Sequence, residues 1–228
     1  MLKQVYKAAV PAALRIRMRH RFDDLFCRPG EDKQTFGTRC PWTVLTRGLG
    51  PDSVVYSGGV GEDISFELDL INRFGVTIQL FDPSPMALHT LSTVPQTSRK
   101  ALRFKPLGLA ARSQPMGFSP LGGVMGHFGK GSAVYWNCTS LRDEMTLNGH
   151  DRIDLLKLDI EGFEYEVLEG CLRDRVFPQQ LCVEFHNFMG AGRWRDTVAL
   201  LLKMRRFGYR IVHKNQYDYT LRHDPGGC

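Results

Sequence analysis

The sequence predicts an α/β domain with a mainly parallel sheet and helices on both faces. Two observations lead to this prediction: apolar strand-like runs alternate with amphipathic helical runs from Ser53 onward, and glycines follow the first of these strands. The 228 residues suit one such domain with an N-terminal extension, and the 43% hydrophobic and 24% charged residues are ordinary globular values. We therefore predict a helical, basic extension at 1–50 and a folded domain at 51–228.

The first elements of this domain follow one another closely. Ser53–Ser57 is a short apolar strand, and Glu62–Gly75 is a helix whose apolar residues share one face and whose final glycine suits a C-terminal cap. Val76–Asp82 is the second strand. Ser84–Val94 is the next helix, with Pro85 in its first turn, where proline is well tolerated.

The second half of the domain repeats the alternation after a long interruption. The stretch Ser113–Ser132 is rich in Gly, Pro and Ser and is predicted to be a loop; loops of that length are usually functional or mobile. Apolar runs predict three more strands, at Leu102–Ala110, Arg152–Ile160 and Gln180–His186. Helical periodicity predicts one helix that ends near Gly170 and another at Trp194–Gly208. A hairpin around Asn215 is predicted to close the domain.

Charge and cysteine usage suggest the surroundings of the protein. The net charge is +6, and Leu2–Phe26 is predicted to be a helix whose basic residues precede the first acid, Asp23. The simplest interpretation is a solvated basic helix; contact with a membrane surface or a polyanion stays open. The six cysteines form no CxxC pair, so we expect free thiols in a reducing compartment and a cytoplasmic location.

The turn after the first strand, SGGVGED (Ser57–Asp63), has the character of a cofactor site. The third glycine of a dinucleotide fingerprint would fall at Ile64, and no Lys-Ser/Thr pair of a P-loop follows. Asp82 ends the second strand, where an acid accepts hydrogen bonds from ribose hydroxyls. A glycine turn with acids, no diphosphate cradle and a ribose acid together predict a site for S-adenosylmethionine, which has a ribose, no phosphate and a cationic sulfonium.

Polar residues gather where two later strands end. Asp159 and Glu161 share one face of a strand end, and Glu184 and His186 repeat that spacing on the next strand. If the strands are neighbours, their edges lie about 4.8 Å apart and the four side chains converge. In a structural interpretation, Glu161 caps the following helix, Glu184 pairs with an arginine and His186 is an ordinary rim histidine.

The functional interpretation of these four residues has two forms. In one, His186 is a general base oriented by Asp159 or Glu184. In the other, Asp159, Glu184 and His186 bind Mg²⁺ or Mn²⁺, which lowers the pKa of a bound hydroxyl directly. The metal-free base is preferred, and the metal alternative stays open.

The sequence resembles the FkbM family of S-adenosylmethionine-dependent methyltransferases. The motifs that carry the resemblance run from about Val54 to His186: VVYSGGVGEDISFELDLINRFG, LFDPSP, TSLRDEM, IDLLKLDIEGFEYEVLEG and LCVEFH. The resemblance implies a Rossmann-like class I methyltransferase fold, with a mostly parallel seven-stranded sheet and a C-terminal hairpin. It also implies methyl transfer, typically to oxygen on sugars or other small molecules.

The resemblance also implies roles for individual residues. Asp82 would hold the ribose, and Asp159 would face the amino group of the cofactor or the acceptor. Five residues would line the methionine and ribose part of the cofactor: Ser57, Gly58, Gly59, Gly61 and Asp63. Leu107 and Gly108 would flank the adenine. The sequence departs from the family in one place, since Tyr56 replaces an acid and the turn reads G-G-x-G instead of G-x-x-x-G.

Two other functions are weighed against methylation of a glycan or small molecule. A nucleic-acid methyltransferase fits the basic balance, but DIEG stands where base-amino methyltransferases usually carry an Asn/Asp-Pro-Pro-aromatic turn. A catalytically idle binding protein that kept the fold is the other alternative. Failure to bind the cofactor would favour it.

Overall fold

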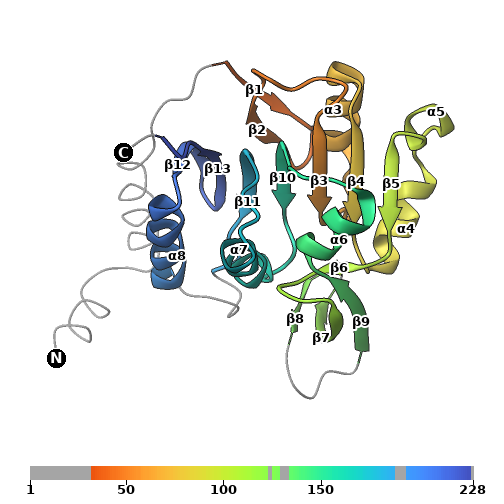
Figure 1. Ribbon diagram of the computed structural model, residues 1–228. Coiled ribbons are helices and arrows are strands. Elements are labelled where there is room, and N and C mark those ends of the chain that lie inside the picture. The colour runs from red at the N-terminus through yellow and green to blue at the C-terminus, as the bar shows by residue number, and fades with distance from the viewer. Residues whose placement is uncertain (1–31, 123–124, 129–133, 188–193, 227–228) are drawn as a thin grey trace, which may run out of the picture.

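The computed structural model describes residues 32–226 apart from 123–124, 129–133 and 188–193 (Figure 1). The basic helix predicted at Leu2–Phe26 lies outside the described residues, as do Cys27 and Cys228. The four described cysteines are free thiols, as predicted. Within the described part of the chain, no helix combines the length and apolar character needed to cross a membrane.

The centre of the molecule is a seven-stranded sheet in the order β12-β13-β11-β10-β3-β4-β5 (Figure 1). β3, β4, β5, β10 and β11 pair in parallel, and β13 pairs antiparallel with both β11 and β12. This confirms the Rossmann-like, mostly parallel sheet and its C-terminal hairpin. The strand bounds are β3 Val54–Gly58, β4 Thr77–Phe81, β5 Leu102–Lys105, β10 Leu155–Leu158, β11 Gln180–Glu184, β12 Tyr209–Asn215 and β13 Asp218–His223.

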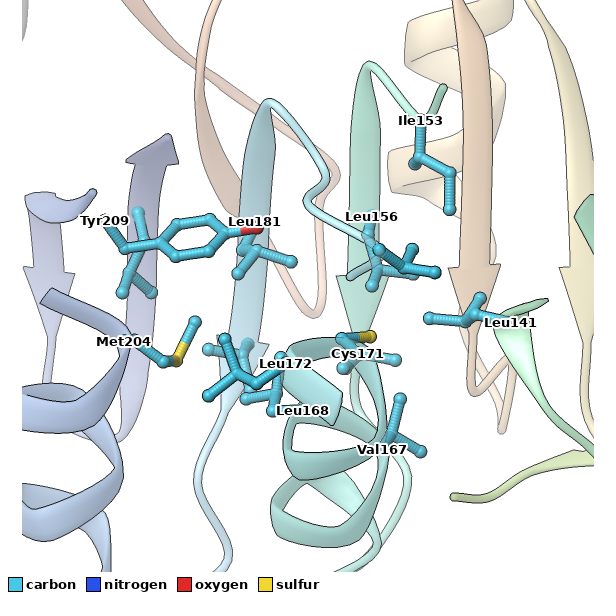
Figure 2. Close-up of a cluster of buried hydrophobic side chains, with 14 of the residues drawn as sticks. Leu141, Ile153, Leu156, Val167, Leu168, Cys171, Leu172, Leu181, Met204 and Tyr209 are labelled. Atoms are coloured by element: carbon cyan, nitrogen blue, oxygen red, sulfur yellow. The ribbon is translucent and has the colours of Figure 1, made fainter. Parts of the chain in front are cut away.

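Helices cover both faces of this sheet, so its central strands are apolar on both sides. Neighbouring residues of β10 belong to opposite cores: Leu156 packs with the helices of one face, and Leu155 with those of the other. On the first face, Leu168 of α7 and Met204 of α8 pack over β10 and β11 (Figure 2). The first face carries α6 (Leu141–Asn148), α7 (Glu164–Arg173) and α8 (Trp194–Arg206); the second carries α3 (Ser65–Phe74) and α4 (Pro85–Ser92), with the short α5 (Gln96–Arg99) after α4.

The stretch Ser113–Ser132 is not the loop that its composition predicts. It contains β7 (Gln114–Gly122) and β8 (Met125–Phe128), which belong to a second, four-stranded sheet of order β6-β9-β7-β8. The other members are β6 (Gly108–Leu109) and β9 (Val134–Thr139). The prediction was wrong because pairing of β7 with β9 outweighs a local composition rich in Gly and Pro.

The same sheet also divides one predicted strand. Leu102–Ala110 was expected to be continuous, but β5 pairs with β4 in the main sheet, whereas β6 pairs with β9 in the small one. The chain therefore leaves the main sheet at the carboxyl end of β5. The small sheet begins beside the edge where the parallel strands end (Figure 1).

The segment expected as a lead-in before residue 50 contains a hairpin, β1 (Lys33–Phe36) with β2 (Trp42–Leu45). Trp42 and Val44 are buried in the core that includes α3. The Gln180 side chain also bonds the backbone of Leu45, accepting from its N–H at 2.6 Å and donating to its C=O at 3.0 Å. The packed unit therefore includes this hairpin, which lies before the boundary predicted at residue 50.

Candidate active site

The parallel strands end at a pocket of about 390 Å³, which is where ligands bind in open α/β sheets. Its walls come from the turn after β3, the ends of β4, β10 and β11, the small sheet and the segment before β2. Most of the residues predicted for the site line this pocket: Gly59, Gly61, Asp63, Asp82, Gly108, Asp159, Glu161, Glu184 and His186.

Three residues predicted to contact the cofactor do not line the pocket. Ser57 is fully buried, and its hydroxyl donates to Glu67 Oε1 at 2.6 Å. A Cβ on Gly58 would lie 2.8 Å from Leu109 Cδ1, so this glycine serves close packing. Leu107 packs against the core, while the next residue along the chain lines the pocket. The motif placed these residues near the site, but only the structure separates those facing it from those beneath it.

Gly59 holds the glycine turn against the end of β10. Its φ is +87°, and a Cβ there would lie 1.8 Å from the Asp159 carbonyl oxygen. Its N–H donates to the Phe81 carbonyl at 2.9 Å. Glycine is required here both by backbone conformation and by space.

Asp82 ties the end of β4 to the same turn. Its Oδ2 accepts from the N–H groups of Val60 at 2.8 Å and Gly61 at 3.0 Å, and its Oδ1 accepts from Ser84 N–H at 2.7 Å. A carboxylate has about four acceptor positions, so these three bonds leave capacity for a hydroxyl donor from the pocket. Asp82 thus lies on the pocket wall with an acceptor position left, and its binding of a ribose stays a prediction.

Lys157, which the sequence reasoning missed, connects the two ends of the pocket. Its side chain is 6% exposed, and Nζ donates to the Gly59 carbonyl and lies 3.7 Å from Asp159 Oδ2. Burial alone would lower the pKa of Lys157, but Asp159, Glu67 and Asp82 outweigh it and raise that pKa. The sequence does contain an indication of this role, because a lysine is almost never buried within an apolar strand unless it is paired with acceptor or acidic groups.

His186 is oriented by Glu164, a second residue that the sequence reasoning missed. Glu164 is fully buried, and its Oε1 lies 2.8 Å from His186 Nδ1. Because the same oxygen accepts from backbone N–H groups, it acts as the acceptor here, so Nδ1 donates to it and Nε2 is turned elsewhere. Glu164 Oε1 also accepts from the N–H groups of Ile160 and Gly162. Glu164, and not Glu161, therefore satisfies backbone groups of the turn before α7, and among the described residues no side chain caps α7 itself.

Three carboxylates surround the Nε2 of His186. It lies 3.5 Å from Glu161 Oε2, 3.8 Å from Asp159 Oδ1 and 3.9 Å from Glu184 Oε2. Glu161 has a φ of +55°, which is uncommon for a residue other than glycine. The structure confirms that the two strand ends are adjacent, since β10 and β11 pair in parallel. The four predicted side chains therefore do converge.

This concentration of acid shifts the protonation of the cluster. Burial and the neighbouring Asp159 carboxylate raise the pKa of Glu184 to about 8, and the same causes raise the pKa of Asp218 on β13 to about 6. Burial would lower the pKa of His186, but the hydrogen bond to Glu164 and the surrounding carboxylates raise it to about 9. The pKa of His186 thus lies above the range near 6–7 that suits a general base at neutral pH.

Two aromatic residues end on different sides of the site. Trp136 of β9 lines the pocket, whereas Tyr135 is 65% exposed.

Tyr56, which replaces the family's acid, is fully buried and absent from the pocket wall. Its hydroxyl bonds His150 Nδ1 at 2.9 Å and accepts from Asn148 at 3.1 Å. The departure from the family pattern therefore lies in the core below the turn.

Comparison with known proteins agrees with this architecture. Residues 108–211 match the family model described as the methyltransferase FkbM domain, which confirms the resemblance seen in the motifs. The chain is 27% identical over 173 residues to a rat protein named probable methyltransferase-like protein 24, covering 70% of this chain and 42% of that protein. The human protein of the same name is 28% identical over the same shares. The chain spans about two fifths of the length of these relatives, and together the matches support a methyltransferase.

Proposed function

We propose that this chain, whose residues 108–211 match the FkbM methyltransferase domain, transfers a methyl group from S-adenosylmethionine to a hydroxyl of a sugar, glycan or other small molecule. One observation carries the proposal: a single pocket joins the glycine turn and Asp82 to the cluster of Asp159, Glu184 and His186. A ribose-binding acid and groups that manage a hydroxyl proton thus face the same cavity.

The charge of the pocket suits a cationic cofactor. Acidic side chains on the wall outnumber the basic Arg39, Lys157 and His186, even without Glu184, whose pKa is raised to about 8: Glu62, Asp63, Glu67, Asp82, Asp159 and Glu161. A sulfonium is attracted to such a wall, whereas a phosphate is repelled. This favours S-adenosylmethionine as the methyl donor, and it disfavours a nucleic-acid acceptor despite the net charge of +6.

The reaction needs alignment and removal of one proton. The acceptor oxygen attacks the methyl carbon, the carbon–sulfur bond breaks, and sulfur keeps the electron pair as a neutral thioether. Alignment of donor and acceptor can supply roughly 7–11 kcal/mol, and a positioned base about 10²–10⁴-fold in rate. In this proposal Asp82 and the glycine turn hold the donor, while the cluster around His186 receives the hydroxyl.

The test is calorimetric titration of the full chain with S-adenosylhomocysteine. Asp82→Ala should weaken binding about 10- to 150-fold, because a hydrogen bond to a charged group contributes roughly 1.5–3 kcal/mol. Asp82→Asn, which keeps one acceptor oxygen, should fall between. The exposed Asp52→Ala, a matched acid away from the pocket wall, should bind like the original protein.

Two outcomes would contradict the proposal. If the folded protein does not bind S-adenosylhomocysteine at all, the idle binding protein is the better account. If radiolabelled methyl groups pass from S-adenosylmethionine to RNA or DNA but to no sugar or small hydroxyl compound, the acceptor class proposed here is wrong.

A further inference from the structure

The cluster beyond β10 and β11 has the donor set of a metal site. Asp159, Glu184 and His186 each offer one ligand atom, and these atoms lie within 4.8 Å of one another. The separations of His186 Nε2 from Asp159 and Glu184, 3.8 and 3.9 Å, exceed the usual N–H···O distance of about 2.9–3.0 Å. Ligand atoms about 2.1 Å from a six-coordinate cation lie about 3.0 Å apart when adjacent and about 4.2 Å apart when opposite. The three ligand atoms therefore stand wider apart than adjacent ligands of a bound ion, which leaves space between them for a cation to draw them together.

The orientation of His186 points to the same ligand independently. Its side chain is 4% exposed, and Nδ1 donates to the fully buried Glu164. Glu164 is itself fixed by the backbone N–H groups of Ile160 and Gly162. Histidines that bind metals almost always donate their second ring N–H to a carboxylate or carbonyl in this way, which turns the other nitrogen toward the ion.

Glu161 supplies a third observation. Its Oε2 is buried, has no hydrogen-bond partner among the described residues and lies 3.5 Å from His186 Nε2. A buried polar atom without a partner is destabilising. A cation between these groups would satisfy this oxygen and also separate the neighbouring carboxylates of Asp159 and Glu184.

We propose that Asp159, Glu184 and His186 bind one divalent cation of the Mg²⁺ or Mn²⁺ class, with Glu161 as a further oxygen donor and Glu164 positioning His186. Such ions take about six ligands, so at least two coordination positions stay open for neighbouring oxygens of a diol acceptor. The cation lowers the pKa of a bound hydroxyl, so that its proton can leave without a histidine base. This role rests on the proposed methyl transfer, whereas binding of the cation does not.

The experiment measures Mn²⁺ binding to the metal-stripped full chain by electron paramagnetic resonance, without any cofactor. One Mn²⁺ should bind per chain, and pulsed spectra should show coupling to an imidazole nitrogen that His186→Ala removes. Glu184→Gln should weaken affinity at least about tenfold, and Glu164→Gln should weaken it less. The matched control is Glu62→Gln, since Glu62 is also a pocket acid but pairs with Arg39 at 3.2 Å; its Mn²⁺ affinity should be unchanged.

The inference is overturned by any of three results: no saturable Mn²⁺ binding, no nitrogen coupling, or equal losses in Glu184→Gln and Glu62→Gln. Circular dichroism shows whether each variant is folded. Titration of the same samples with S-adenosylhomocysteine separates the two proposals. Cofactor binding without Mn²⁺ binding would support the proposed function and contradict the cation site. Mn²⁺ binding without cofactor binding would support the cation site and contradict the proposed function.

Discussion

The pocket has two halves, one around Asp82 and the glycine turn and the other around His186, and their acidic side chains have different hydrogen-bond partners. In the half around the glycine turn and Asp82, which we propose binds the cofactor and call the cofactor half, Asp82 accepts three backbone hydrogen bonds of 2.7 to 3.0 Å. Asp63 similarly accepts from Cys40 N–H at 2.9 Å and Ser65 N–H at 3.0 Å. In the other half, the oxygens of Asp159 and Glu184 stand 3.8 and 3.9 Å from the nearest nitrogen of His186.

In our proposal, this difference separates a half that the chain completes by itself from a half that a bound cation completes. The backbone amides around Asp82 satisfy that carboxylate before any ligand arrives, so the cofactor half is already formed. In the half around His186, Nε2 lies 3.8 and 3.9 Å from the oxygens of Asp159 and Glu184, too far for good hydrogen bonds, whereas Glu184 shares a side-chain hydrogen bond with Asp159. In our proposal, a divalent cation binds between these groups. Lys157 lies between the halves and contacts both.

The largest expected effect comes from removing the residue that joins the halves. Lys157→Met should lower the free energy of unfolding by about 3–5 kcal/mol, because it leaves buried Glu67 and Asp159 without their cation. Denaturant unfolding followed by circular dichroism measures this loss. The double variant Lys157→Met/Glu67→Gln should recover part of it. Equal stability of Lys157→Met and the original protein would show that the two halves do not depend on this contact.

The next effect tests how closely the two halves approach each other. Gly59→Ala should destabilise the fold by about 1–3 kcal/mol more than Gly61→Ala, because its Cβ would lie 1.8 Å from the Asp159 carbonyl oxygen. Both glycines have positive φ, but a Cβ at Gly61 meets nothing within 4 Å. Gly61→Ala thus controls for the backbone conformation alone. Equal melting temperatures for the two variants would contradict the close contact.

The pH dependence of cation binding sharpens the comparison further. Metal ligands must lose their protons, and the raised pKa values of Glu184, about 8, and His186, about 9, keep both protonated at pH 6. Mn²⁺ affinity should therefore rise from pH 6 to pH 8, by at least about tenfold. The charged groups that face the cluster come from β10, α7, β11 and β13 and the turn after β10: Lys157, Asp159, Glu161, Glu164, Glu184 and Asp218. An affinity that stays constant or falls over this range would argue against these ligands.

The smallest effect concerns the residue that departs from the family pattern. Tyr56→Phe removes the hydroxyl that bonds His150 and Asn148, which should cost about 1 kcal/mol of stability. It should leave the affinity for S-adenosylhomocysteine unchanged, since Tyr56 is not on the pocket wall. Weaker cofactor binding with unchanged stability would place Tyr56 in the cofactor half after all.

The fold was largely predictable, because its central strands are apolar runs that end at punctuating glycines or acids. The spacing of Asp159 with Glu161 and of Glu184 with His186 also predicted their convergence, since both pairs lie at the ends of adjacent parallel strands. The small sheet was not predictable, because β7 gains its stability from pairing with β9 and not from its composition.

The supporting residues of the site were also beyond the sequence. Glu164 was obscured by the other acids of DIEGFEYE, and only its hydrogen bond to His186 singles it out. The role of Lys157 could not be predicted without knowing that β10 pairs with β3, which places Lys157 Nζ against the carbonyl of Gly59. The choice between a metal-free base and a metal stays a prediction, because the burial of His186 and the number of acids around it depend on tertiary structure.

The most direct test is a crystal structure of the full chain with S-adenosylhomocysteine and Mn²⁺, with anomalous data collected for manganese. The account predicts one anomalous peak between Asp159, Glu184 and His186, and ribose hydroxyls within hydrogen-bonding distance of Asp82. An anomalous peak elsewhere, or a cofactor whose ribose lies against the His186 cluster, would contradict the division of the pocket into these two halves.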